Sequence, residues 1–199
     1  MMKEIKIFVD FNTGKVKYQD NDIWYEVHKQ ESNEPYSLAI VGSRKINNGQ
    51  IVNRIINCCK FIFGKPTKVV SGGAKGIDTI GEQWADNQNI EKLIFLPDWD
   101  KEGKKAGMLR NHDIIKNCDL CLAIWDGESH GTMHDFQLCE QYKKDLLIFN
   151  VKEYIDKSFC GFYYRKYNQD ELVNRSAQKQ YQAQPKNNRW LPQPGIINI

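Results

Sequence analysis

Residues 67–78, TKVVSGGAKGID, run from a short apolar β-rich segment through a glycine-rich turn into a helical pattern. The same arrangement occurs at residues 37–44, SLAIVGSR, and at residues 119–132, DLCLAIWDGESHGT. Two more apolar segments, EKLIFL (91–96) and DLLIF (145–149), are likewise separated from their neighbours by helical patterns. Apolar strands that alternate with helices predict a parallel sheet covered on both faces. We therefore expect an α/β protein with a Rossmann-like, doubly wound parallel sheet of about five strands.

Two segments flank this core, which we place at residues 36–150. Residues 1–35 contain short β-rich runs and turn sequences, which predict a small N-terminal antiparallel β extension. Residues 151–199 begin with an aromatic cluster, become rich in Asn and Gln, and predict a C-terminal arm. Apolar residues at the end of this arm predict a homo-oligomer, a dimer or larger, whereas its polar part also fits a solvated tail. These apolar residues are Trp190, Leu191, Ile196 and Ile197.

Composition is that of an ordinary soluble globular protein. The 199 residues are 41% hydrophobic and 27% charged, and no apolar run is long enough to span a membrane. The acidic N-terminal segment lacks the apolar block of a secretory signal, so we expect a cytoplasmic protein. Residues 36–159 carry 17 basic and 16 acidic residues, a net charge of +1. This near balance argues against nucleic acid as a partner.

The sequence predicts no metal and no cofactor. Cys118 and Cys121 are three residues apart in a predicted strand, where their side chains point to opposite faces. His130 and His134 lack a clear third ligand. The six cysteines are too few for a disulfide scaffold in a chain of this length.

Three glycine-containing turns follow predicted strands, and two of them run into helices. They are residues 41–44, 71–78 and 126–132. Glycine lets a backbone approach a phosphate closely, and amides at a helix N-terminus donate to it. We expect a phosphate cradle in which Arg44, Lys75 and Arg110 neutralise the ligand. The alternative is that the turns serve only the backbone and that Asp78 and Thr132 only cap helices. The turns lack the Walker and dinucleotide patterns, which disfavours P-loop ATP hydrolysis and NAD-dependent oxidoreduction.

The turns and the stretch PDWDKEGKKAGMLRN (97–111) resemble motifs of the SLOG superfamily, most closely those of its YspA-like branch. The resemblance covers about residues 36–150 and implies a Rossmann-like domain that binds nucleotides or their ribosylated derivatives. Trp99 and Trp125 would either stack on a base or pack in the protein. The predicted ligand-binding residues are Gly42, Ser43, Arg44, Gly72, Gly73, Lys75, Gly76, Asp78, Trp99, Arg110, Asn111, Gly131 and Thr132.

Three functions are consistent with this resemblance. The first is a sensor or sequestering protein that binds an ADP-ribose-type or cyclic nucleotide and releases it unchanged; a role in phage–host signalling follows only by analogy. The second is a ribosyl hydrolase of the "lonely guy" type, with Asp135 as the catalytic carboxylate and Arg110 holding phosphate. Asp135 is one methylene shorter than the glutamate of those enzymes, and their Pro-Gly-Gly opening is absent, which favours a protein that is not an enzyme. The third is a DNA-binding protein of the DprA type, supported by the basic tail.

Overall fold

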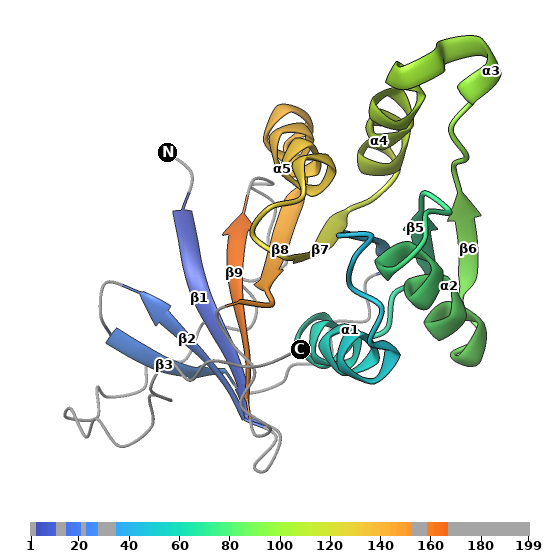
Figure 1. Cartoon of the computed structure of the whole chain (residues 1–199). Helices are drawn as coiled ribbons and strands as arrows, with labels where there is room; N and C mark the ends of the chain where they lie inside the picture. Colours follow the sequence, from blue (N-terminus) through green and yellow to red (C-terminus); the bar gives the residue numbers. More distant parts are fainter. Residues whose placement is uncertain (1–2, 11–14, 21–22, 28–34, 153–158, 167–199) are drawn as a thin grey trace.

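The computed structural model describes residues 3–10, 15–20, 23–27, 35–152 and 159–166, which form one mixed sheet flanked by helices (Figure 1). The strands are β1 (Lys3–Asp10), β2 (Lys15–Asp20), β3 (Ile23–Val27), β4 (Ser37–Gly42), β5 (Lys68–Ser71), β6 (Glu91–Ile94), β7 (Leu120–Trp125), β8 (Asp145–Asn150) and β9 (Phe159–Lys166). The helices are α1 (Gly49–Phe63), α2 (Ile77–Asn87), α3 (Trp99–Glu102), the 3-10 turn η1 (Gly103–Lys105), α4 (Ala106–Lys116) and α5 (His130–Tyr142).

The central part of the sheet is parallel and has the strand order of a Rossmann fold. The five strands from β4 to β8 lie in the order β6-β5-β4-β7-β8, and every contact between them is parallel. In chain order this arrangement is 3-2-1-4-5, which confirms the predicted fold class. The strand order reverses between β4 and β7, so the crevice at their carboxyl ends is where such folds bind ligands.

Alternate residues of the parallel strands face two different helix layers. In β4, Leu38 and Ile40 belong to the hydrophobic cluster covered by α1 and α2, whereas Ala39 and Val41 belong to the cluster covered by α4 and α5. All four residues are at most 3% exposed. Burial on both faces explains why this strand is an uninterrupted apolar run rather than an alternating one.

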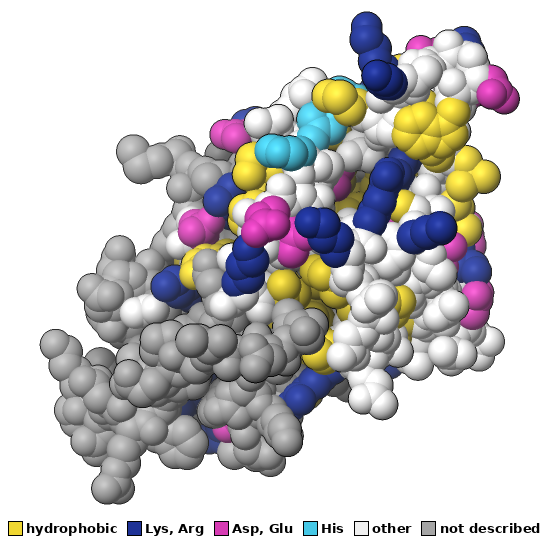
Figure 2. All heavy atoms as spheres, in the orientation of Figure 1, with side chains coloured by type: hydrophobic (Ala, Val, Ile, Leu, Met, Phe, Trp, Pro, Cys, Tyr) yellow, Lys and Arg dark blue, Asp and Glu magenta, His cyan; other side chains and the backbone are white. Residues whose placement is uncertain are grey.

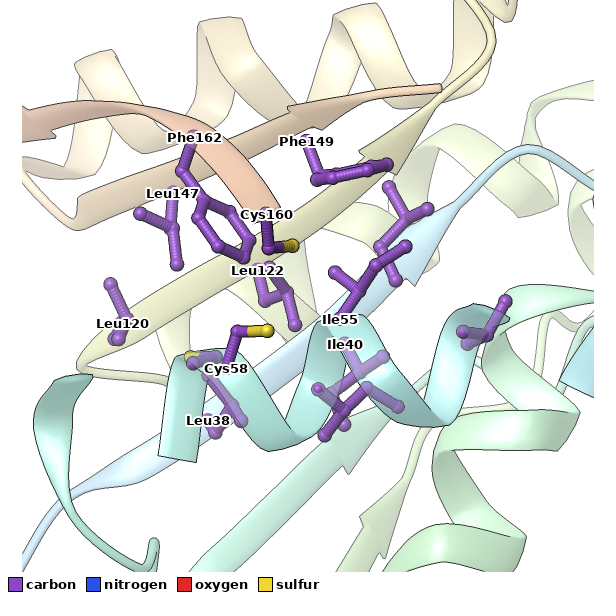
Figure 3. Close-up of a cluster of buried hydrophobic side chains, with 14 of the residues drawn as sticks. Leu38, Ile40, Ile55, Cys58, Leu120, Leu122, Leu147, Phe149, Cys160 and Phe162 are labelled. Carbon is purple, nitrogen blue, oxygen red and sulfur yellow. The ribbon is translucent and has the colours of Figure 1, made fainter. Parts of the chain in front are cut away.

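Strand β9 connects the N-terminal strands to the parallel core. It pairs antiparallel with β8 on one side and with β1 on the other, and β2 and β3 continue the sheet beyond β1. Cys160 and Phe162 extend the cluster beneath α1 (Figure 3). Part of the predicted C-terminal arm is therefore a strand inside the sheet, because alternate apolar residues of this segment can join the hydrophobic core. The sheet runs across both boundaries of the predicted 36–150 segment.

The remaining predictions about the arm concern residues outside the described ones, including Trp190, Leu191, Ile196 and Ile197. Within the described ranges, no helix has the length and apolar character needed to cross a membrane.

Candidate functional site

The first predicted turn lies at the point where β4 and β7 diverge. A Cβ on Gly42 would clash with the backbone oxygen of Ile124 at the end of β7 and would lie 2.7 Å from Cγ1 of Ile77. Glycine is required here because the three segments approach one another so closely. The turn is thereby held between β7 and the start of α2, near the middle of Figure 1.

The second turn follows β5 and depends on two glycines. Gly73 and Gly76 have φ values of +65° and +84°, which favour glycine. A Cβ on Gly76 would lie 2.9 Å from the backbone oxygen of Arg44, so the first and second turns are in contact. Gly76 is also the N-cap of α2 and supplies no side-chain hydrogen bond to the helix. The first residues of α2, Ile77 and Asp78, are 0% and 3% exposed, and the Thr79 N–H donates to the carbonyl oxygen of Ala74 at 3.2 Å, so these amides are largely enclosed.

Arg44 and Lys75 bring positive charge to these two turns. Both residues are exposed, and neither forms an ion pair with any residue that the structure describes. Figure 2 shows Lys and Arg side chains in the middle of this face, with acidic side chains beside them. Two unpaired cations beside an uncapped helix suit a phosphate group in solvent.

Ser43 has a structural role that differs from its predicted contact with ligand. Its side chain is 1% exposed. Its backbone N–H donates to the carbonyl oxygen of Ile124 at 3.1 Å, and its Oγ accepts from the backbone N–H of Asp126 at 3.2 Å. Ser43 therefore ties the first turn to the third.

The third turn leads into α5 with a side-chain cap. Ser129 Oγ accepts from the backbone N–H of Thr132 at 3.4 Å, and the Thr132 hydroxyl lies 3.0 Å from the same oxygen. Thr132 is buried, whereas Gly131 is exposed. Thr132 thus belongs to the cap, and only Gly131 of this pair is exposed to an incoming ligand.

The acidic residues of the third turn are paired within the protein. The Asp126 carboxylate accepts from the backbone N–H groups of Glu128 and Ser129, at 3.0 and 2.8 Å. Burial alone would raise the pKa of Asp126, but these hydrogen bonds outweigh it and the pKa is lowered. Glu128 pairs with Lys152, with Nζ 2.6 Å from Oε1. These pairings reduce the repulsion that the two acids would exert on an anion.

Arg110 comes from α4 and lies beneath the second turn. A Cβ on Gly72 would overlap its guanidinium, so the side chain rests directly against that glycine. Its Nη1 is 3.4 Å from Oδ2 of Asp78, and both side chains are less than 10% exposed. Asn111, the next residue of α4, is 8% exposed. The structure thus brings Gly72, Asp78 and Arg110 together, as the sequence predicted, but places the charged pair inside the protein.

Two buried carboxyl groups accompany Arg110. Burial raises the pKa of Asp78 to about 6, although the positive charge of Arg110 and the Ala74 N–H group oppose this shift. Burial also raises the pKa of Asp135 well above its usual range, and the charge of Asp78 adds to the effect. Asp135 is 4% exposed. Its burial leaves it poorly placed to act on a ribosyl bond in solvent.

Apolar side chains border the second turn. Trp99 is 52% exposed, and its ring lies against Gly107, within 3.4 Å of the position of a Cβ there. Leu96 is 72% exposed and lies close to Gly73. The predicted residue Trp99 is thus an accessible flat surface at the start of α3, beside Gly107 of α4. The apolar neighbour Leu96 was not predicted, because its side chain reaches the turn only through the tertiary fold.

No group of three or more metal-ligating side chains occurs among the described residues. His134 lies against His112 and not against a metal partner, with ring centroids 5.6 Å apart. All six cysteines are buried and free. Cys118, Cys121 and Cys139 are part of the hydrophobic core beneath α4 and α5.

The chain resembles DNA-processing proteins. A family model described as DNA recombination-mediator protein A matches residues 16–99, less than half of the chain. The Gene 61 protein of Mycobacterium phage D29 is 42% identical over 33% of this chain and 58% of its own length. The fold was also compared with a solved structure of DNA processing protein A from Helicobacter pylori, which comes from a study of single-stranded DNA binding. The aligned region covers 62% of this chain and 70% of the Helicobacter pylori chain, with 19% sequence identity and a TM-score of 0.45.

These comparisons support the resemblance to the SLOG superfamily and correct the predicted function. The matched segment contains the first two turns, and the model that it matches describes DNA recombination mediators, not nucleotide sensors. Binding of an ADP-ribose-type or cyclic nucleotide signal, and the exclusion of nucleic acid, were therefore wrong predictions. The ribosyl hydrolase alternative receives no support, and the similarity is to DNA-binding proteins rather than to hydrolases.

Proposed function

We propose that the protein binds single-stranded DNA at the turns after β4 and β5. The observation that carries this proposal is the contact between those turns, Gly76 against the backbone of Arg44, within the segment that resembles DNA recombination mediators. The contact sets the exposed Arg44 and Lys75 side chains beside the uncapped start of α2. Cations of this kind bind the phosphodiester backbone whatever the base sequence.

A preference for single strands follows from the apolar border of the site. Leu96 is exposed next to the second turn, and Trp99 is exposed at the start of α3, against Gly107 of α4. Base faces are accessible in a single strand, where they stack on aromatic side chains, and are covered in a duplex. Assignment of the chain to the YspA-like branch remains a prediction, because its distinctive stretch at residues 97–111 lies almost wholly beyond the matched segment.

The salt dependence of DNA binding tests the assignment of the two cations. Each phosphate contact with a single strand contributes about 0.7 to the slope of log K against log salt concentration. We expect Arg44→Ala and Lys75→Ala each to weaken binding of a labelled oligothymidylate and to reduce that slope by about 0.7. Fluorescence anisotropy between about 50 and 200 mM salt measures both quantities.

Lys65→Ala is the matched control. Lys65 is exposed like the two site cations, but it precedes β5, whereas the second turn follows that strand. Its Nζ donates to the backbone oxygen of Gln88. Its removal is expected to leave the slope unchanged. Absence of binding even at low salt, or equal effects of all three substitutions, would contradict the proposed site.

A further inference from the structure

The carboxyl ends of four parallel strands place a row of basic residues along one edge of the sheet. At this edge β5, β4, β7 and β8 end side by side in that order. Lys75 follows β5, Arg44 and Lys45 follow β4, and Lys152 follows β8; all four residues are exposed. Figure 2 shows Lys and Arg side chains spread across the middle of this face, with Asp and Glu side chains among them. Adjacent strands lie about 4.8 Å apart, so the row from β5 to β8 is roughly 14 Å long.

Lys152 is held beside the third turn by contacts with two strands. The backbone N–H of Val151 donates to the carbonyl oxygen of Trp125 at 2.9 Å and ties the end of β8 to the end of β7. The backbone N–H of Lys152 donates to Oδ1 of Asn150 at 3.0 Å. Its side chain lies against Gly127, where a Cβ would be 3.4 Å from Cδ and 3.8 Å from Nζ. The ammonium group of Lys152 therefore belongs to the same edge of the sheet as the first two turns.

Glu128 neutralises this end of the row. Its Oε1 lies 2.6 Å from Nζ of Lys152, and the two side chains are 63% and 56% exposed. The pKa of Glu128 is lowered by the hydrogen bond from Lys152 and by the charges of Lys152 and Lys45, so Lys45 also lies near this carboxylate. Asp126, the other acid of the turn, accepts from two backbone N–H groups. Because an exposed ion pair is weak, a phosphate can displace the Glu128 carboxylate from Lys152.

We infer that a bound single strand continues along this edge to the end of β8, with Lys45 and Lys152 as further phosphate contacts and Glu128 as the acid that weakens them. The inference rests on the proposed DNA binding and extends that site beyond Arg44 and Lys75. Open α/β sheets bind ligands along the carboxyl ends of their strands. A nucleic acid strand presents an anion at every nucleotide and can therefore meet cations along the whole row. Such contacts fix the path of the strand without reading its bases.

Removal of the Glu128 charge is the sharpest test of this path. We expect Glu128→Gln to tighten the binding of a labelled oligothymidylate to the full chain by about two- to fivefold, because Lys152 no longer has a competing partner. Fluorescence anisotropy at about 0.1 M salt measures the change. Glu91→Gln is the matched control: Glu91 forms a surface ion pair with Lys68 at 3.1 Å, but at the amino ends of β5 and β6. The net charge changes equally, and screening over about 10 Å should leave DNA affinity unchanged.

Two further substitutions test the phosphate contacts themselves. Lys45→Ala and Lys152→Ala should each weaken binding and reduce the slope of log K against log salt concentration by about 0.7. Lys152→Arg retains the charge and should keep both quantities. Thermal unfolding of each variant verifies that the fold is retained, as expected for exposed side chains.

The outcomes separate this path from the proposed function. Unchanged binding in the variants of Lys45, Lys152 and Glu128, together with weaker binding when either cation of the first two turns is removed, would overturn the path and leave DNA binding intact. Equal tightening by Glu128→Gln and Glu91→Gln would also overturn it, because net charge alone would then explain the gain. Failure of the unmodified chain to bind any strand at low salt would overturn the proposed function, and the extended path with it.

Discussion

Gly42 has no side chain, and this allows β7 and the start of α2 to approach the end of β4 closely. The backbone oxygen of Ile124 and the side chain of Ile77 occupy the space that a Cβ would need. Ile124 is part of β7 and Ile77 begins α2, so moving either residue away would disturb a strand or a helix. The approach of these elements brings the first turn into the site, and it depends on this one residue.

Gly42→Ala is expected to destabilise the protein by about 1–3 kcal/mol, the usual effect of inserting a group into a filled space. Urea denaturation followed by circular dichroism measures the change. Gly49→Ala is the control, because a Cβ at Gly49 meets nothing within 4 Å at the first residue of α1. That substitution should be neutral or stabilise by a few tenths of a kcal/mol. Equal destabilisation by both changes would refute the argument.

Asp78 links the stability of the protein to pH. Burial, partly opposed by Arg110, raises the pKa of Asp78 to about 6, above the ordinary aspartate value of about 3.9. Between these values the folded state holds a proton that the unfolded state has released. The contribution of this group is therefore full below about pH 4 and is lost as the pH rises through about 6, by about 3 kcal/mol in total.

Asp78→Asn should remove that part of the pH dependence. The free energy of unfolding of wild type and variant, measured by chemical denaturation from about pH 4 to 7, gives the difference between the two curves. The charge of Asp78 contributes to the raised pKa of Asp135, so the difference between the curves reports the titration of Asp78 together with its effect on Asp135. Parallel curves would show that Asp78 titrates normally in the folded state.

At the scale of elements, a buried side-chain hydrogen bond connects β9 to β8. The hydroxyl of Tyr164 donates to Oδ2 of Asp145, at the start of β8, over 2.7 Å, and Tyr164 is 1% exposed. Tyr164→Phe is expected to cost about 1–3 kcal/mol in the free energy of unfolding, measured by urea denaturation, because the buried carboxylate loses a donor while the ring remains. An unchanged free energy of unfolding in this variant would contradict the role of the hydrogen bond.

Elements differ in how far the sequence predicts them. Strands β4, β5, β7 and β8 were predicted because burial on both faces makes each a nearly continuous apolar run, whereas the edge strand β6 is partly exposed. Strand β9 has aromatic residues on both faces, with Tyr163 beneath Lys6 and Tyr164 in the core, so its pattern resembles no simple strand. In the site, Arg110 and Asp78 were predicted from their motifs. The burial of Ser43 and the raised pKa of Asp135 arise from distant contacts that spacing along the chain does not reveal.

At the scale of the whole molecule, net charge misled the functional prediction. The near balance over residues 36–159 sums all cations and acids, whether or not they are paired with one another in the fold. DNA affinity depends instead on the few cations that reach phosphates. In the folded protein Glu128 is paired with Lys152 and Asp78 with Arg110, whereas Arg44 and Lys75 have no ion-pair partner among the described residues. Pairing, more than the number of charges, determines which groups an approaching strand meets.

The position of β9 also constrains how the chain is made. Strand β1 pairs with β9 along its length, from Lys3 opposite Lys166 to Asp10 opposite Phe159, so the first strand to be synthesised has its partner near the end of the described chain. During translation strands β1 to β3 leave the ribosome long before β9 is synthesised. The edge of β1 that pairs with β9 therefore remains unpaired until then. The parallel core can assemble from local β–α units as they emerge. Completion of the sheet is thus a late step in folding, with a high loop-closure cost.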